Sequence, residues 1–260
     1  DIGNGRAPVE VRVAGEGTPL VYLHGAGGLM PNDRMFAALA AQFQVHAPLL
    51  PGYGDSEGED ELKDMLDTTL HTGDVIAALD LIKAPLVGHS MGGTVAAQTS
   101  ELRPDAISVA VYLCAFLLPD GESIVDFYDR AWEDWMTGAH ARVSYSDDGH
   151  LSMIDPVSAI DVFYNTADPA DAKAAAAQLT PQPEGGRRSR LQRSDENFGR
   201  VPRVYIETLQ DRSVFNELQK RMYGETPCET LYTLDTDHAP QLSVPDELAA
   251  MLLSVAASHR

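Results

Sequence analysis

The chain has 260 residues, of which 44% are hydrophobic, and its formal net charge is −20. This length and apolar content are enough to bury the core of one α/β domain that carries an insertion. The strongly acidic balance disfavours nucleic acid and anionic membrane surfaces as partners, so a small-molecule substrate is the expected partner.

The first fifty residues alternate strand and helix patterns. Residues 9–13 alternate in polarity as an exposed strand does, and after a glycine turn residues 20–23 form a fully apolar strand. These two segments predict an early hairpin. A helix is expected over residues 33–42 and a strand over residues 45–49.

The alternation continues through the chain with one interruption. Helical spacing over 62–81 and 94–102 flanks a short strand at 86–87, and residues 107–113 form another apolar strand. The later elements are a strand at 204–206, a helix at 214–223, a strand at 230–234 and a closing helix from Val244. Repeated βα units predict the α/β class, with a mainly parallel central sheet and helices on both faces.

The interruption covers residues 119–197, where polar and aromatic residues mix and an alanine-rich helical stretch spans 170–179. A break of this length in the βα rhythm indicates an inserted, mostly helical cap. Residues 1–118 and 198–260 are then expected to form the core.

One serine lies in a tight strand-to-helix turn. The apolar run at 85–87 leads into Gly88-His89-Ser90-Met91-Gly92 and then into a helix of small residues. A G-x-S-x-G turn of this kind projects the hydroxyl above the sheet, and its glycines leave room for the tight backbone. Ser90 is therefore the predicted nucleophile, and its chemistry requires a base and an acid.

Candidates for both partners lie downstream. His238 follows the last predicted strand, in a loop that can reach the carboxyl edge of the sheet, and is the predicted base. Asp211 lies just past the preceding strand and is the predicted acid. Glu207 and Asp237 remain alternative acids, and Asp120 is a less favoured one. All three belong to loops or strand ends where a solvated carboxylate is the ordinary interpretation.

Negative charge that develops on a substrate carbonyl oxygen needs two backbone N–H donors. One of them is expected from Met91, the residue after the nucleophile. The other is expected from the glycine-rich loop after the first apolar strand, where Ala26 is the candidate donor. Gly25 in the same loop is a candidate substrate-binding residue.

Aromatic residues of the predicted cap are candidates for a substrate pocket. Trp132, Trp135 and Phe163 could line an apolar pocket above the serine or form the core of the cap itself.

A basic cluster also lies in the predicted cap and follows a glycine pair. Its members are Arg187, Arg188, Arg190 and Arg193. A solvated loop is the favoured interpretation, and a surface that faces an anionic substrate or partner is the alternative.

Metal ions and other cofactors are not expected. Cys114 and Cys228 lie far apart without a C-x-x-C motif and are predicted to be free thiols, with no zinc site. The polar N-terminal segment and the absence of a long apolar run predict a cytoplasmic chain without a membrane partner. A start at Asp1 leaves a trimmed leader open, and a homodimer also stays open.

Taken together, these features resemble the α/β hydrolase superfamily, in the branch that holds plant methylesterases, hydroxynitrile lyases and pyrethroid-hydrolase-like carboxylesterases. The similar stretches are residues 111–120, 202–211 and 237–248. The resemblance implies an α/β hydrolase fold. It also implies roles for the same residues: Ser90 as nucleophile, Asp211 and His238 as its partners, and Ala26 and Met91 as oxyanion donors.

The leading hypothesis is a cofactor-independent carboxylesterase that cleaves a small, apolar or aromatic ester through an acyl-enzyme. Lyase members typically carry threonine or asparagine where this chain has Gly25, and some carry lysine where it has Ala239, which favours hydrolysis. A hydroxynitrile lyase or a C–C bond hydrolase on the same triad is the first alternative. A non-catalytic small-molecule-binding homologue is the second.

Overall fold

The computed structural model describes residues 8–29, 33–50, 52–57, 82–131 and 142–259. Within them, a seven-stranded sheet has the strand order β1-β3-β2-β4-β5-β9-β10. Its strands are β1 (Val11–Ala14), β2 (Thr18–Leu23), β3 (Phe43–Pro48), β4 (Ala84–His89), β5 (Ile107–Leu113), β9 (Arg203–Thr208) and β10 (Thr230–Leu234). Every neighbouring pair is parallel except β1 with β3. The predicted mainly parallel sheet is confirmed.

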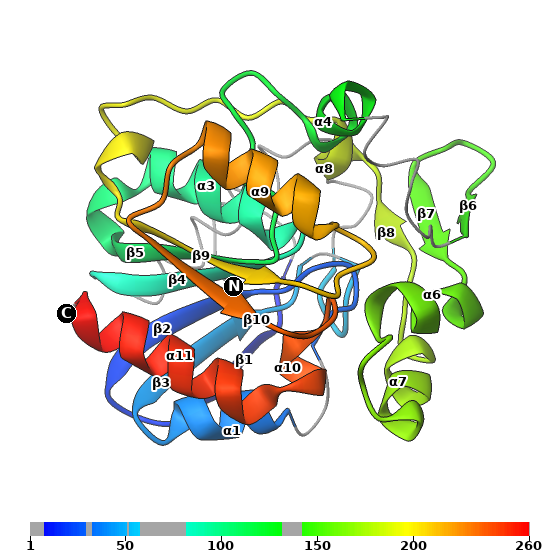
Figure 1. The fold of residues 1–260 in the computed structure, drawn as a ribbon, viewed down its shortest axis with the longest axis horizontal. Helices are drawn as coiled ribbons and strands as arrows, with labels where there is room; N and C mark the ends of the chain where they lie inside the picture. The colour runs from blue at the N-terminus through cyan, green and yellow to red at the C-terminus, as the bar shows by residue number, and fades with distance from the viewer. Residues whose placement is uncertain (1–7, 30–32, 51, 58–81, 132–141, 260) are drawn as a thin grey trace.

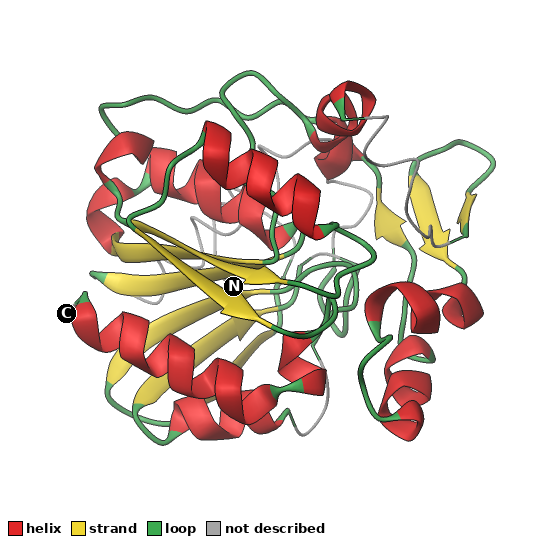
Figure 2. Cartoon of the chain, in the orientation of Figure 1, coloured by secondary structure: helices red, strands yellow, loops and turns green. Residues whose placement is uncertain are grey.

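Helices cover both faces of this sheet (Figures 1 and 2). Helices α3 (Gly92–Leu102) and α9 (Asn216–Glu225) lie on one face, and α1 (Arg34–Ala40) and α11 (Pro245–Ser258) lie on the other. Apolar side chains of α3 and α9 belong to one buried cluster and those of α1 and α11 to a second. The predicted helices on both faces are therefore confirmed, while the helix expected over 62–81 lies outside the described residues.

The predicted early hairpin is wrong. Strand β1 pairs antiparallel with β3, and β2 lies between β3 and β4. Burial gives the physical reason, because residues 20–23 of β2 are buried and require neighbours on both sides, whereas β1 is mostly exposed and suits a sheet edge. Alternating polarity thus predicted the exposure of β1 correctly but not its partner.

Between β5 and β9 the chain forms a second group of elements. These are α4 (Ile124–Arg130), β6 (Val143–Tyr145), β7 (Leu151–Ile154), α6 (Pro156–Phe163), α7 (Pro169–Ala176), β8 (Gln182–Pro183) and α8 (Gly185–Arg188). The three strands form an antiparallel sheet of order β6-β7-β8. Figure 1 shows α6, α7, β6 and β7 beyond the carboxyl ends of the main strands. The division into a core and a cap over 119–197 stays a prediction.

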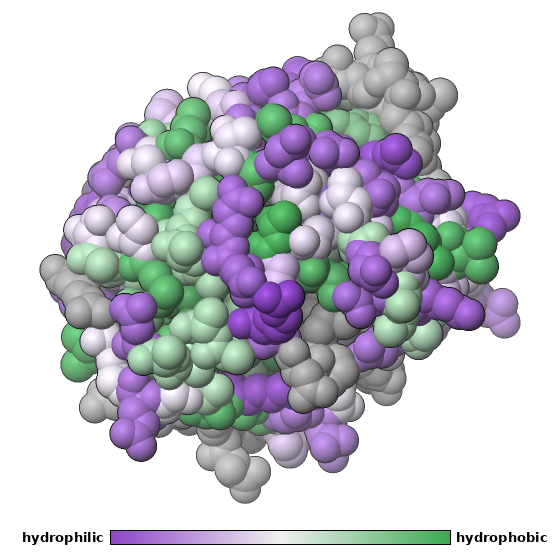
Figure 3. Space-filling model, turned by 60° about the horizontal axis from the view of Figure 1, so that its bottom comes forward, coloured by the Kyte–Doolittle hydropathy of each residue, from purple (hydrophilic) through white to green (hydrophobic). Residues whose placement is uncertain are grey.

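The outer surface mixes polar and apolar residues. Figure 3 shows hydrophilic and hydrophobic side chains interspersed on the face turned toward the viewer. In the part of the chain that the structure describes, no helix combines the length and the apolar character needed to cross a membrane.

Two glycines in helices provide a matched test of the packing around the start of α3. A Cβ on Gly93 would lie 2.5 Å from the carbonyl oxygen of Phe116, whereas a Cβ on Gly224 in α9 would meet nothing within 4 Å. We expect Gly93→Ala to lower the free energy of unfolding by about 1–3 kcal/mol, because backbone must move to admit the methyl group. Gly224→Ala should instead raise it by up to about 1 kcal/mol, since alanine favours the helix. Urea denaturation measures both, and equal effects of the two substitutions would contradict the packing described here.

Candidate active site

Ser90 occupies the turn between β4 and α3. Its φ is +54°, a left-handed conformation that is uncommon for residues other than glycine. A Cβ on Gly88 would lie 2.5 Å from the carbonyl oxygen of Gly92, and a Cβ on Gly92 would lie 2.5 Å from that of Leu23. Both positions therefore require bare backbone, as the G-x-S-x-G pattern predicted. The turn fixes the serine at the carboxyl end of β4, beside the start of α3.

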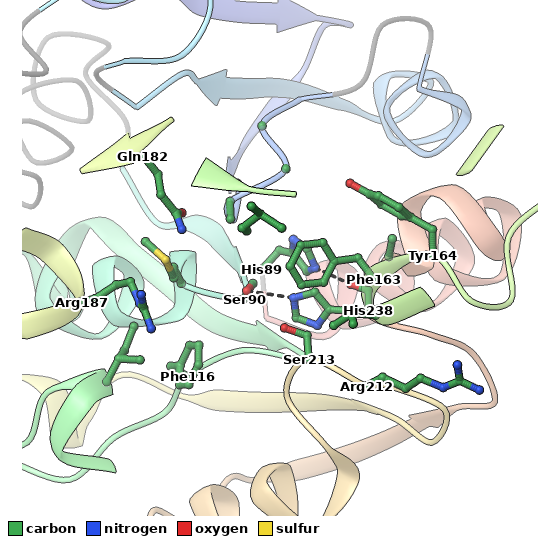
Figure 4. Close-up of a pocket in the computed structure, with 18 of the residues that line it drawn as sticks. His89, Ser90, Phe116, Phe163, Tyr164, Gln182, Arg187, Arg212, Ser213 and His238 are labelled. Atoms are coloured by element: carbon green, nitrogen blue, oxygen red, sulfur yellow. Dashed lines mark hydrogen bonds between the residues drawn. The ribbon is translucent and has the colours of Figure 1, made fainter. Parts of the chain in front are cut away.

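A row of hydrogen bonds joins the three predicted triad residues, and Figure 4 shows the part between Ser90 and His238. Nε2 of His238 lies 2.9 Å from Oγ of Ser90, and Nδ1 of His238 lies 2.7 Å from Oδ2 of Asp211. All three residues are buried. A carboxylate only accepts hydrogen bonds, so Nδ1 carries the proton and the Nε2 lone pair faces the serine hydroxyl. This is the tautomer in which a histidine can take the proton of Ser90.

The carboxylate of Asp211 is held by several donors besides the histidine. Its Oδ1 accepts hydrogen bonds from the backbone N–H groups of Ser213 and Val214, each at 2.8 Å. Its Oδ2 accepts another from Nε2 of Gln219 at 3.1 Å. These donors stabilise the charged carboxylate and fix its direction toward His238. The loop after β9 thus supplies an oriented acid.

The two distant alternative acids have other partners. Glu207 accepts a hydrogen bond from the hydroxyl of Tyr223, and Asp120 accepts one from the backbone N–H of Arg193. In the described structure, the carboxylate that bonds the imidazole of His238 is that of Asp211.

Asp237 holds the histidine loop in place. Its side chain is fully buried and accepts hydrogen bonds from the backbone N–H of Ala239 at 3.0 Å and from Oγ of Ser243 at 2.8 Å. It also accepts one from the backbone N–H of Thr166 at 2.8 Å, which connects the inserted segment to the loop of His238. The sequence identified Asp237 only as an alternative acid, because its contact with Thr166 spans 71 positions.

His89, inside the serine turn, supports the same loop. Its Nε2–H donates to the carbonyl oxygen of His238 at 2.7 Å, so the ring is bonded to the histidine loop. Burial, and secondarily the nearby His238, lowers the pKa of His89 to about 3. The ring is therefore neutral at physiological pH and serves as a structural hydrogen-bond donor.

One group of side chains that could hold a metal gathers among the described residues. His89, Cys114 and His238 bring potential ligand atoms within 4.8 Å of one another. These atoms already have partners, since both ring nitrogens of His238 are hydrogen-bonded, and Nε2 of His89 and Sγ of Cys114 contact its carbonyl oxygen. Burial also raises the pKa of the Cys114 thiol, which disfavours the thiolate that metals bind. Cys114 and Cys228 are free thiols, as predicted.

A cavity of about 150 Å³ opens above Ser90. Ala26 and Met91, the predicted oxyanion donors, both lie in its wall. Gly25 lies directly against the serine, where an added Cβ would be 2.6 Å from Cβ of Ser90. The glycine-rich loop and the start of α3 therefore meet at the serine. The oxyanion and substrate-binding roles of these residues remain predictions.

Aromatic side chains form part of the cavity wall. Phe163 and Tyr164, at the end of α6, both line it, and the ring centroid of Phe163 lies 5.4 Å from that of His238. Figure 4 shows Phe163 beside the histidine and Tyr164 farther from it. Phe163 therefore lies in the cavity wall, and its substrate-binding role stays a prediction. Trp132 and Trp135 lie outside the described residues, so their assignment to the pocket stays a prediction.

The basic cluster is not simply a solvated loop. Arg187 lines the cavity, and its guanidinium donates to the buried carboxylate of Glu184. Arg190 pairs with a carboxylate of α4, and Arg193 packs its guanidinium carbon 4.5 Å from the centroid of a phenylalanine ring. Of the four arginines in this cluster, only Arg188 and Arg190 are exposed. The favoured interpretation is wrong for Arg187 and Arg193, because the chain folds back over α4, and the types of neighbouring residues do not reveal this fold-back.

Comparison with known proteins identifies the family. Residues 20–251 match the alpha/beta hydrolase family, and the chain belongs to it. The chain is 33% identical over 180 residues to putative methylesterase 11, chloroplastic, of Arabidopsis thaliana, a match that covers 67% of this chain and 46% of that protein. It spans about half the length of the first curated relatives it matches.

Solved structures agree with this assignment. The fold is similar to that of tomato methylketone synthase I complexed with 2-tridecanone, with a TM-score of 0.77 and 22% identity over 94% of this chain and 99% of the other. It is also similar to a pyrethroid hydrolase, with a TM-score of 0.75 and 23% identity over 93% of this chain and 98% of the other. The suspected branch of the superfamily is confirmed by these names together with the methylesterases.

His24, beside the glycine-rich loop, generates a prediction about stability and pH. Its Nδ1–H donates to the carbonyl oxygen of Gly25 at 2.7 Å, while Nε2 accepts from the backbone N–H of Leu50 at 3.0 Å. Protonation of Nε2 would remove the second bond, and burial lowers the pKa of His24 from 6.5 to about 4. Between these values the unfolded chain binds one proton more than the folded chain. Stability should therefore fall as the pH falls from 6.5 toward 4.

We expect His24→Gln to reduce this pH dependence, because glutamine does not titrate. The slope of unfolding free energy against pH should decrease by about 1.4 kcal/mol per pH unit in the middle of the window. Urea denaturation of both proteins between pH 4 and pH 7 measures it. Parallel curves, offset but with the same slope, would show that His24 is not held neutral.

Proposed function

We propose that the chain is a serine esterase that hydrolyses small carboxylic esters. The observation that carries this proposal is the continuous row of hydrogen bonds from Asp211 through His238 to Ser90, which ends at a cavity. Family membership and the methylesterase relatives support an ester as the bond that is cleaved. The mixed apolar and aromatic cavity wall supports an apolar or aromatic substrate.

The first half of the reaction forms an acyl-enzyme. Oγ of Ser90 attacks the ester carbonyl carbon while Nε2 of His238 takes the hydroxyl proton. Asp211 stabilises the imidazolium that results, since its carboxylate is fixed against Nδ1. The backbone N–H groups of Met91 and Ala26 are the proposed donors to the carbonyl oxygen as it becomes negative. His238 then gives its proton to the leaving alcohol.

The second half releases the acid. Water enters the cavity, His238 takes one of its protons, and the resulting hydroxide attacks the acyl carbonyl carbon. The bond to Oγ of Ser90 breaks as His238 returns the proton to that oxygen. Every proton is carried by the side chains already described, so we propose a reaction that consumes only water and ester.

Two catalytic alternatives would use the same residues but release other products, and a third alternative would use the same fold without catalysis. A hydroxynitrile lyase or a C–C bond hydrolase would release products from a cyanohydrin or a vinylogous diketone instead of an ester. Gly25 and Ala239 occupy positions where lyase members typically carry polar or basic side chains, which supports hydrolysis. A non-catalytic binding protein has no need for the tautomer that the bond between Asp211 and His238 maintains.

Hydrolysis of a panel of short and medium acyl and aryl esters tests the proposal. We expect Ser90→Ala to lower kcat/KM by at least about 10³-fold, because no other hydroxyl is bonded to Nε2 of His238 among the described residues. Ser100→Ala is the matched control, since its buried hydroxyl bonds only the helix carbonyl of Ala96 in the described structure. It should change kcat/KM by no more than about twofold.

Undiminished hydrolysis by Ser90→Ala would overturn the assignment of the nucleophile. Circular dichroism of both variants separates lost chemistry from lost structure. Cleavage of a cyanohydrin with no cleavage of any ester would replace the esterase with the lyase.

A further inference from the structure

One end of the cavity carries two polar side chains that ester hydrolysis itself does not require. Gln182 of β8 and Arg187 of α8 line this end, close together in sequence. Figure 4 shows both on the same side of Ser90, opposite Tyr164 and Arg212. Neither side chain belongs to the proposed triad or oxyanion site, so their presence calls for another explanation.

Gln182 presents an unsatisfied amide. The residue is 6% exposed, and its Nε2 donates to Oγ of Ser152 at 3.3 Å. Its Oε1 is buried without a hydrogen-bond partner among the described residues. If the amide were turned over, Oε1 could bond Ser152 and the NH₂ group would be the unpaired one. In either orientation half of the amide is left for a ligand, and a buried polar group without a partner is destabilising.

Arg187 contributes hydrogen-bond donors, and the charge of its guanidinium is balanced by the carboxylate of Glu184. Its Nη1 donates to both carboxylate oxygens of Glu184, at 2.9 and 3.2 Å, and Glu184 is 3% exposed. Within the described part of the chain, no further hydrogen bond is made by the other N–H groups of this guanidinium. The pair is therefore neutral overall, yet it still offers hydrogen-bond donors at the cavity wall.

We propose that Gln182 and Arg187 form a subsite that binds a neutral hydroxyl group on an otherwise apolar ester. The inference rests on the proposed esterase function and names the substrate class for the same cavity. A hydroxyl oxygen accepts from the guanidinium of Arg187, and the hydroxyl proton is donated to Oε1 of Gln182. A hydroxyl also suits the reversed amide, because it can accept from NH₂ as well.

A carboxylate does not fit this subsite equally well. A carboxylate can only accept hydrogen bonds, so with the amide as described it leaves Oε1 of Gln182 unpaired, and only with the amide turned over can it accept from the NH₂ group. It would also approach Glu184, whose negative charge already occupies the guanidinium of Arg187. Two carboxylates on one buried guanidinium repel each other, since burial weakens solvent screening. The subsite thus distinguishes a hydroxyl from both hydrogen and carboxylate.

Methyl esters with three different ring substituents test this discrimination: hydrogen, hydroxyl or carboxylate. Each substituent is placed at the meta or the para position of methyl phenylacetate and of methyl 3-phenylpropanoate, so that its distance from the ester carbonyl also varies. For the best-fitting position, we expect kcat/KM of the hydroxyl ester to exceed that of both analogues by at least about tenfold, because the analogues leave buried polar groups unpaired.

Variants then assign the preference to residues. In Gln182→Leu and Arg187→Met, the ratio of kcat/KM for hydroxyl over hydrogen ester should fall about tenfold toward unity, while the hydrogen ester is still cleaved. Gln241→Leu is the matched control, because Gln241 also lines the cavity with a buried, unpaired Oε1 but lies in α10 (Pro240–Ser243) after the histidine loop. It should leave the ratio unchanged. Glu184→Gln should raise the relative kcat/KM of the carboxylate ester, because it frees the charge of Arg187.

Binding measurements separate this proposal from the proposed function. Calorimetry with Ser90→Ala protein reports affinity for the same esters without turnover. Tighter binding of the hydroxyl ester, abolished by adding Gln182→Leu or Arg187→Met, supports the subsite even if the parent cleaves nothing. Equal affinity for hydroxyl and hydrogen esters at every position overturns the subsite even if all are hydrolysed. A hydroxyl preference lost only in Gln241→Leu, or a parent preference for the carboxylate ester, overturns it as well.

Discussion

The left-handed turn at Ser90 is the constraint on which the rest of the site depends. A non-glycine residue at a φ of +54° is strained, and such strain persists only where the surrounding structure holds it. Here the chain packs closely around the serine turn, because Gly25, Gly88 and Gly92 each lie where a Cβ would collide. The parallel sheet and α3 meet at this point. The hydroxyl is consequently presented at the carboxyl edge of the sheet, where loops from other strands can reach it.

The histidine loop is the complementary half of this arrangement. His238 is hydrogen-bonded through both ring nitrogens. Its carbonyl oxygen accepts a hydrogen bond from His89, the residue directly before Ser90 in the serine turn. Asp237 accepts hydrogen bonds from the histidine loop and from Thr166, and so links the loop to the inserted segment. The position of the proposed base therefore depends on both the core and the insertion. The acid, by contrast, is held by the end of β9, by its own loop and by α9.

Local patterns in the sequence were sufficient for much of the fold and for the three triad candidates. Gly88 to Gly92 identifies the serine turn because glycine spacing reflects backbone geometry, and Asp211 and His238 follow strands whose carboxyl ends share one edge. The pairing of β1 with β3 could not be predicted in the same way. Alternating polarity along a strand indicates that one face is exposed, but it does not indicate which strand lies beside it. Gln182 was not singled out at all, and a position of Arg187 facing a substrate was only the alternative interpretation. The role of Arg187 depends on where the chain folds back, a long-range property that basic residue types do not encode.

The central claim is that this turn activates one serine as a nucleophile. The most direct measurement is labelling of the parent protein with a fluorophosphonate at neutral pH, followed by peptide mass mapping, with a His238→Ala protein labelled in parallel. The account predicts a single covalent adduct on Ser90, formed at least about a hundredfold more slowly without the histidine. An adduct on another residue, no adduct at all, or equal labelling rates in the two proteins would contradict it.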